Sequence, residues 1–417
     1  MSHDCGCDSQ APRDGLLPVE EARATLLAAA PRLTDHHPVP LAEAAGRVLA
    51  EAVVSPIDVP GHDNSAMDGY AVRAADTQAA PCVLPVSQRI PAGHNGEPLQ
   101  PGTAARIFTG APLPPGADAV IMQEQTEPAA EGVRLLRPVR PGENVRPRAN
   151  DVARGSEVLA AGTRLTPQAV GLLASLGIDR VEVRVRPRVA LLCTGDELAE
   201  PGEPLLPGQI YNSNRPMLSA LLGQAGCEVL DLGRVEDTLA ATRQALHAGA
   251  EAADLILTTG GVSVGEEDHV KAAVEAEGEL HLWRLRMKPG KPLAFGTVAG
   301  TPLLGLPGNP VSAFVTALLF ALPFLRQMQG RAPAFPAPLW ARFDGDWPRP
   351  RPRREFLRVR LRAPEQPGPP WAEPFARQGS DVLTGAVWAD GLLEVPEERT
   401  WQRGDLLRYW PFTTLLD

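Results

Sequence analysis

The stretch DLILTTGGVSVGEE at residues 254–267 carries the pattern that decides the fold. The segment Asp254–Leu257, apolar after its first residue, predicts a buried β-strand, and Gly260 and Gly261 predict a tight loop directly after that strand. A helix is expected to follow the loop. The same order of apolar run, polar loop and helix recurs on both sides of this stretch. Residues 187–332 are therefore expected to form a mostly parallel sheet covered by helices.

The segments that flank this region have different patterns. Residues 15–62 and 149–186 predict one discontinuous helical and linker domain, in which Thr166 can cap a helix. Residues 63–148 alternate short apolar runs with Pro and Gly turns, which predicts an inserted β-rich domain. Residues 333–417 hold short strand-like runs and six of the seven tryptophans, so a C-terminal β-barrel is expected there.

Charge and cysteine content exclude several classes of protein. The 417 residues include 40 basic and 50 acidic side chains, a net charge of −10, which disfavours a general nucleic-acid binder. No run of 18 apolar residues and no signal-peptide pattern occurs, so we expect no membrane span and a cytoplasmic protein. The odd count of five cysteines argues against a disulfide framework. No role is predicted for Cys5 and Cys7, which lie in a polar tail.

Three polar loops follow predicted strands in the α/β region. They are Thr194–Glu197, Thr258–Gly265 and Leu306–Ser312. Open parallel sheets bind ligands at the carboxyl ends of their strands, so these loops are candidates for one binding site. In the second loop, Gly260 and Gly261 let backbone N–H groups approach an anion, and Ser263 adds a hydroxyl.

A basic row precedes the third loop. Alternation along a predicted strand, Leu280–Met287, puts Arg284, Arg286 and Lys288 on one face. Residues 288–292 have the sequence KPGKP, in which two prolines stiffen the pair formed by Lys288 and Lys291. A stiffened lysine pair at the end of a strand is well suited to hold an oxyanion.

Three acidic residues, opposite in charge to this basic row, lie at the ends of predicted loops. They are Glu197, Asp237 and Asp268. Any one of them alone is typical of a helix cap or a surface charge. Together they fit a hard cation such as Mg²⁺, held by few carboxylates and by substrate phosphate.

Six motifs, in this order, resemble the MoeA-type molybdopterin molybdenumtransferases, a family that includes the C-terminal domain of gephyrin. Each motif is weak alone, but all six in order are specific, and the match extends over roughly residues 15–415. The motifs are DNSAMDGYAV (63–72), FTGAP (108–112), TGDEL (194–198), SVGE (263–266), KPGKP (288–292) and PGNPVS (307–312).

The resemblance implies an elongated multidomain homodimer of class α/β plus β. Its parts would be a MogA-like three-layer α/β/α molybdopterin-binding domain, the inserted β-rich domain and the C-terminal β-barrel. In that family the inserted domain of one subunit reaches towards the site of the other. Asp68 and Thr109 would then lie near the α/β domain of the partner chain.

The resemblance also assigns roles to individual residues, including Arg353 in the stretch RREF (353–356) and Ser380 in the stretch QGS (378–380). It makes Asp68, Thr109, Glu197, Asp237 and Asp268 the catalytic group, of which the last three would hold the metal. The substrate and molybdate cradle would consist of Gly260, Gly261, Ser263, Lys288, Lys291, Pro307, Asn309, Pro310, Ser312, Arg353 and Ser380. A lysine is common in the family where Arg284 stands, and a planar guanidinium does not replace a point charge.

The implied activity is the insertion of molybdate into adenylylated molybdopterin, which releases AMP and forms the molybdenum cofactor. The implied cofactor is Mg²⁺, and the implied partners are a second copy of the chain, a molybdopterin adenylyltransferase and recipient molybdoenzymes. One alternative is a molybdopterin adenylyltransferase, which resembles the α/β domain but lacks the flanking motifs. The other is a non-catalytic scaffold, as gephyrin is for receptors, in which these carboxylates and lysines would be relics.

Overall fold

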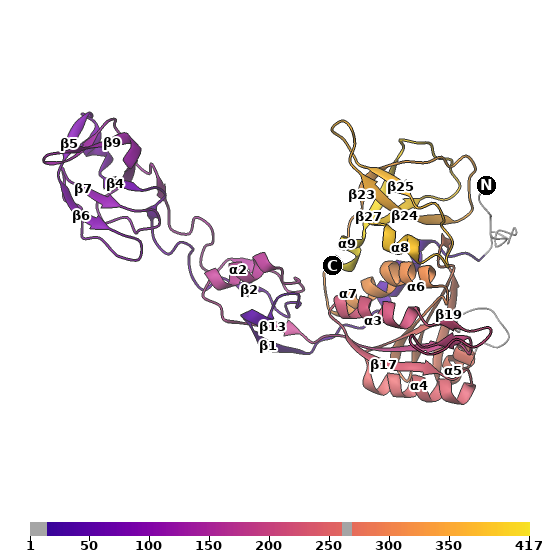
Figure 1. Cartoon of the computed structure of the whole chain (residues 1–417). Helices are drawn as coiled ribbons and strands as arrows, with labels where there is room; N and C mark the ends of the chain where they lie inside the picture. The colour runs from indigo at the N-terminus through magenta and orange to yellow at the C-terminus, as the bar shows by residue number, and fades with distance from the viewer. Residues whose placement is uncertain (1–14, 261–268) are drawn as a thin grey trace. The chain divides into compact units, whose positions relative to one another are not determined.

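The computed structural model describes residues 15–260 and 269–417 (Figure 1). Gly261, Ser263 and Asp268 therefore lie outside the described residues. The chain divides into two compact units, which are treated separately below. Unit 1 consists of Met1–His37, Gly46–Val48 and Val183–Asp417, and unit 2 of Pro38–Ala45 and Leu49–Glu182.

Unit 1 contains a six-stranded sheet in the order β17-β14-β18-β22-β21-β19. The strands are β14 (Arg188–Thr194), β17 (Glu228–Val235), β18 (Leu255–Thr259), β19 (Gly278–Arg284), β21 (Pro292–Val298) and β22 (Thr301–Leu306). The first four strands in the sheet order are parallel, and the last two are antiparallel to their neighbours. The mostly parallel sheet predicted from the sequence is thus confirmed, with an antiparallel extension at one side.

Helices cover both faces of this sheet. They are α3 (Asn214–Gln224), α4 (Leu239–Ala252), α5 (His269–Glu277), α6 (Pro310–Thr316) and α7 (Leu322–Met328). Along β14, Val189 and Leu191 pack into the core that holds α3, α6 and α7, whereas Ala190 and Leu192 pack into the core that holds α4 and α5. A strand buried on both faces must be apolar throughout, which explains its unbroken apolar run. The result is a three-layer α/β/α arrangement (Figure 1).

One apolar helix forms the centre of unit 1. α6 continues through a π-helical turn, Ala317–Ala321, into α7. The 19 residues Pro310–Met328 are long and apolar enough to cross a membrane by length and composition, but 89% of this segment is buried inside the fold. Ser312 and Arg326 interrupt the segment, so it is not an unbroken apolar run. Its burial is that of a core helix.

The strand predicted over 280–287 is wrong as a single element. β19 ends at Arg284, and β20 (Met287–Lys288) pairs with a strand of the C-terminal barrel instead. Burial still alternates across the break, because Leu285 and Met287 are both fully buried. The alternation that predicted one basic face persists, but Arg284 and Lys288 belong to different sheets.

The C-terminal part of unit 1 is a closed five-stranded barrel in the order β24-β25-β23-β27-β26, with β26 returning to β24. Its strands are β23 (Leu339–Phe343), β24 (Arg354–Arg362), β25 (Trp371–Pro374), β26 (Gly391–Val395) and β27 (Leu406–Pro411). Phe343, Leu357, Val359, Leu393 and Tyr409 fill its interior. Two short helices belong to this part of the chain: α8 (Thr384–Trp388) connects β25 to β26, and α9 (Phe412–Leu416) follows β27. The predicted barrel is confirmed.

Unit 2 contains small β-sheets and one α-helix. A four-stranded sheet has the order β6-β7-β4-β8, and a three-stranded sheet has the order β5-β10-β9. The strands are β4 (Gly69–Val72), β5 (Cys82–Leu84), β6 (Val86–Ile90), β7 (Ala104–Ile107), β8 (Ala119–Met122), β9 (Thr126–Ala129) and β10 (Gly132–Leu135). The helix, α2 (Pro167–Ser175), starts as predicted, because the Thr166 hydroxyl accepts a hydrogen bond from the Ala169 N–H.

Candidate functional site

The three loops predicted to bind ligand begin at one edge of the unit 1 sheet. β14, β18 and β22 are parallel neighbours, and they pair up to their carboxyl ends, Cys193 with Thr259 and Thr259 with Leu306. β21 is antiparallel to β22, so it starts at the edge where β22 ends. Residues 288–291, the lysine loop, come directly before β21. The lysine loop therefore reaches the edge where the other loops begin.

Gly260 brings two of these loops into contact. Its φ is +86°, and a Cβ there would lie 2.7 Å from the carbonyl oxygen of Thr194. Gly308 is a further neighbour, since a Cβ on it would be in van der Waals contact with the Cα of Gly260, at 3.9 Å. Only glycine tolerates both the backbone conformation and the close approach at position 260. The loops after β14, β18 and β22 are thus packed against one another.

Asn214, which the sequence analysis missed, ties two of these loops together. It is the first residue of α3 and is 9% exposed. Its Nδ2 donates to Thr259 Oγ1 at 2.8 Å and to the Gly308 carbonyl at 2.7 Å, while Thr259 Oγ1 donates to the Pro307 carbonyl at 3.2 Å. An asparagine at a helix start is usually a cap, so the sequence carried no sign of this role.

The two described carboxylates of the predicted metal group lie at this same edge. Glu197 is exposed, and its carboxylate covers Gly195, where a Cβ would be 2.6 Å from Glu197 Oε2. Asp237 follows the end of β17 at Val235, which pairs with Thr194. Both side chains offer only oxygen ligands, the type a hard cation prefers. Among residues 15–260 and 269–417, no three His, Cys, Asp or Glu side chains gather closely enough to hold a metal.

The lysine loop packs against α6. Gly290 has a φ of +96°, and a Cβ there would lie 2.4 Å from Thr316 Oγ1 and 3.6 Å from the Ser312 carbonyl oxygen. Lys288 and Lys291 flank this contact, and both are half-buried. The structure thus places the lysine pair beside the helix that carries Ser312, whose side chain is itself buried.

A loop of the barrel reaches the start of the same helix. Ser380 Oγ accepts a hydrogen bond from Asn309 Nδ2 at 3.0 Å, and its carbonyl accepts one from the Val311 N–H at 3.0 Å. Pro310, the first residue of α6, lies between these two partners. Arg353 comes directly before β24, the barrel strand that pairs with β20 of the lysine loop. Sequence positions far apart therefore meet around the N-terminal end of α6.

Asp68 and Thr109 form a pair within unit 2. Both are exposed, Asp68 just before β4 and Thr109 just after β7, and these two strands pair. Asp68 Oδ1 accepts hydrogen bonds from the Thr109 N–H and hydroxyl, each at 2.8 Å. These hydrogen bonds, the backbone one first, hold the pKa of Asp68 below its usual value, and the charge of Arg106 adds to the effect.

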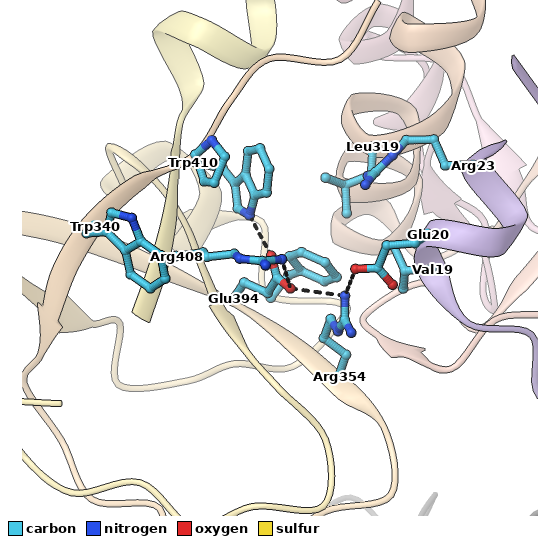
Figure 2. A pocket seen from close by; sticks show the side chains of 11 residues that line it. Val19, Glu20, Arg23, Leu319, Trp340, Arg354, Glu394, Arg408 and Trp410 are labelled. Atoms are coloured by element: carbon cyan, nitrogen blue, oxygen red, sulfur yellow. Dashed lines mark hydrogen bonds and ion pairs between the residues drawn. The ribbon is translucent and has the colours of Figure 1, made fainter. Parts of the chain in front are cut away.

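A separate cavity of about 340 Å³ lies between α1 (Val19–Ala29) and the barrel (Figure 2). Arg354 pairs there with Glu20 and, at 3.0 Å, with Glu394, which also accepts from Trp410 Nε1 at 3.0 Å. The charge of Arg354 inside the cavity is thus neutralised by Glu20 and Glu394. The described residues of the predicted site do not line it. We interpret it as an ionic contact that joins α1 to the barrel.

Sequence profiles of three family regions match the chain in order. The MoeA N-terminal region (domain I and II) matches residues 17–177. A probable molybdopterin binding domain matches residues 190–327. The MoeA C-terminal region (domain IV) matches residues 341–412.

Whole-chain relatives agree with these matches. The molybdopterin molybdenumtransferase of Haemophilus influenzae is 44% identical over 318 residues, which cover 76% of this chain and 78% of the relative. Molybdopterin molybdenumtransferase 2 of Mycobacterium tuberculosis is 41% identical over 387 residues, 90% of this chain and 95% of the relative. The crystal structure of the molybdopterin biosynthesis MoeA protein from Pyrococcus horikoshii superposes with a TM-score of 0.81 at 32% identity, covering 95% of this chain and 100% of that one.

Proposed function

The chain belongs to the MoeA family of molybdopterin molybdenumtransferases, and on this premise we propose which of its residues carry the reaction. It is a transferase of molybdenum cofactor biosynthesis that inserts molybdate into its pterin substrate. One observation carries the assignment of residues. The lysine loop, the start of α6 and the loops after β14, β18 and β22 all lie at a single edge of the sheet.

We assign molybdate binding to Lys288 and Lys291, with the hydroxyl of Ser312. Molybdate is a dianion, and adenylylated molybdopterin carries a pyrophosphate, so bringing the two together is opposed by like-charge repulsion. At about 4 Å and an effective dielectric of about 20, each pair of unit charges costs about 4 kcal/mol. Two ammonium groups beside the oxyanion offset this cost. The two dithiolene thiols then replace one molybdate oxygen, which leaves as water with the two thiol protons, and hydrolysis of the pyrophosphate releases AMP.

The acidic side chains at the same edge suit a divalent cation. Glu197 and Asp237, with Asp268, would hold Mg²⁺, since they offer hard oxygen ligands and leave positions for substrate phosphate. Bound there, the ion would neutralise the pyrophosphate and favour the departure of AMP. Gly260 and Gly261 would present backbone N–H groups to the substrate, and Ser263 a hydroxyl.

The remaining assignments concern the whole assembly. We propose four domains: 15–62 with 149–186, 63–148, 187–332 and 333–417. We further propose a cytoplasmic homodimer in which Asp68 and Thr109 of one subunit serve the site of the other. The pterin would come from a molybdopterin adenylyltransferase and the product would pass to recipient molybdoenzymes. The firm hydrogen bonds that orient Asp68 support an active role for this exposed pair.

A reconstituted reaction tests the proposal. Purified protein is mixed with adenylylated molybdopterin, molybdate and Mg²⁺, and AMP and molybdenum-loaded cofactor are measured together. We expect both products in equal amounts, and neither when molybdate is omitted. A second reaction supplies ATP and unadenylylated molybdopterin. Formation of adenylylated molybdopterin there, without activity in the first reaction, would contradict the proposal and identify an adenylyltransferase.

A further inference from the structure

Arg358 is a cation sealed inside the fold. It lies in the middle of β24, is 0% exposed and is among the largest fully buried side chains. Its Nη1 donates to the Gly379 carbonyl at 3.0 Å and its Nη2 donates to the Arg377 carbonyl at 2.8 Å. Its Nε finds no acceptor, and the guanidinium no carboxylate ion pair, among the described residues. Two carbonyls of one loop are therefore the partners of this buried charge.

Burying a guanidinium without a carboxylate partner costs free energy of folding, so the arginine needs an explanation other than stability. Desolvation lowers the pKa of Arg358 to about 10, although the charge of Asp381 opposes the shift. Replacing a buried ion by an apolar side chain of similar volume is often neutral or stabilising. The contact with α8 is tight as well, because a Cβ on Gly385 would lie 2.9 Å from Arg358 Nε. Stability alone is thus a poor reason for an arginine at this position.

The loop that Arg358 binds is fixed from two sides. Gln378 Oε1 accepts from the Arg358 N–H at 3.0 Å, and Gln378 Nε2 donates to the carbonyls of Arg358 at 2.9 Å and Phe375 at 3.0 Å. The guanidinium fork holds the residues on either side of Gln378. Backbone and side chain of Arg358 together therefore fix the conformation of residues 377–379.

The next residue in the chain is Ser380, the residue of this loop that the proposed function assigns to the substrate cradle. Its position is fixed by the residues before it and by its hydrogen bonds to Asn309 and Val311 at the start of α6. Hydrogen bonds from Arg358 to the Arg377 and Gly379 carbonyls, the peptide bond from Gly379 to Ser380, and the hydrogen bonds of Ser380 thus connect the barrel interior to the start of α6.

We propose that Arg358 is a positioning residue for the transfer reaction, which holds the Arg377–Gly379 turn so that Ser380 meets Asn309 beside the molybdate cradle. The inference rests on the proposed function, because it takes Ser380 to be part of the cradle. The forked geometry of the guanidinium, rather than its charge, is what the role requires, since two neighbouring carbonyls must be held at once.

A double-mutant cycle tests this role. AMP release is followed as a function of molybdate concentration for the wild type, Arg358→Met, Ser380→Ala and the double variant. Misplacing a binding group by about 1 Å can cost up to about a hundredfold, so we expect Arg358→Met to raise the KM for molybdate at least about tenfold. In the Ser380→Ala background the same change should cost no more than about twofold, because the residue it positions is already gone. Effects that multiply would overturn the proposal.

Further variants separate positioning from charge and from folding. Arg358→Lys keeps the charge but not the fork, so we expect the same defect; wild-type KM in that variant would overturn the proposal. Gln378→Ala loosens the turn without emptying the barrel interior, and we expect the same rise in KM with the same dependence on Ser380. Arg360→Met is the matched control, because Arg360 on the same strand donates to the Trp388 carbonyl, away from the loop. An inactive wild type would instead refute the proposed function itself.

Discussion

The N–H and the hydroxyl of Thr109 both donate to a single carboxylate oxygen of Asp68, each at 2.8 Å. Hydrogen bonds to the charged form favour it, so the Asp68 carboxylate stays ionised to lower pH than an ordinary aspartate. Thr109→Val removes the hydroxyl but keeps the N–H and the shape of the side chain. We expect the pKa of Asp68 to rise towards its usual value, measured by NMR titration of its side-chain carbon. Thr126→Val, which removes a hydroxyl elsewhere in unit 2, should leave it unchanged. A pKa of Asp68 that stays the same or falls in Thr109→Val would contradict this account.

Sharing of the site between subunits predicts complementation between two inactive variants. Asp68→Ala and Asp237→Ala are each expected to lose AMP release. In a mixed dimer, the α/β domain of the first variant would be served by Asp68 of the second, which leaves one intact site. Random assortment should restore about a quarter of wild-type activity when the two chains are refolded together. If each chain completes its own site, the mixture will stay inactive.

The contact between Gly290 and Thr316 predicts a sensitive position in the lysine loop. Gly290→Ala combines a positive φ with a Cβ only 2.4 Å from Thr316 Oγ1. We expect a loss of roughly 1–3 kcal/mol in the free energy of unfolding, from urea denaturation. Gly300→Ala is the matched control, since its φ of +85° is similar but nothing lies within 4 Å of the added Cβ. Equal losses in the two variants would show that the close approach is not the cause.

The two hydrogen bonds of Asn214 predict that it links the loops after β18 and β22. Asn214→Leu removes both donors and leaves the Gly308 carbonyl without this partner. We expect a loss of about 1–3 kcal/mol in stability, together with faster amide hydrogen exchange in residues 258–260 and 306–308. Unchanged exchange in both loops would argue that the packing of Gly260 alone holds them.

Much of the fold was predictable because buried strands require a recognisable pattern of apolar residues in the sequence. The runs that became β14 and β18 are apolar on both faces, as a strand of a parallel sheet covered by helices on both sides must be. The choice of partner strand leaves no comparable pattern in the sequence. Because Leu285 and Met287 continue the alternation across a change of partner strand, one strand was predicted where the chain passes from β19 into β20.

The same reasoning explains which site residues could be found. The chain holds only three lysines, and two of them stand in the pentapeptide 288–292, so the lysine loop stands out in the sequence. Arg358 does not stand out, because Arg358, Arg360 and Arg362 alternate along β24 as a solvated face would. Arg358 differs from its neighbours because α8 and the loop at residues 377–379 cover it. That packing depends on closure of the barrel and cannot be predicted from local pattern.

The dependence of AMP release on molybdate tests the central claim most directly. Initial rates are measured over a range of molybdate concentrations for the wild type, for Lys288→Ala and for Arg399→Ala, which removes an exposed positive charge elsewhere on the barrel. We predict that Lys288→Ala raises the KM for molybdate at least about tenfold, the loss of about 1.4 kcal/mol of binding, while Arg399→Ala behaves like the wild type. An unchanged molybdate dependence in Lys288→Ala would contradict the assignment of the oxyanion site to the lysine loop.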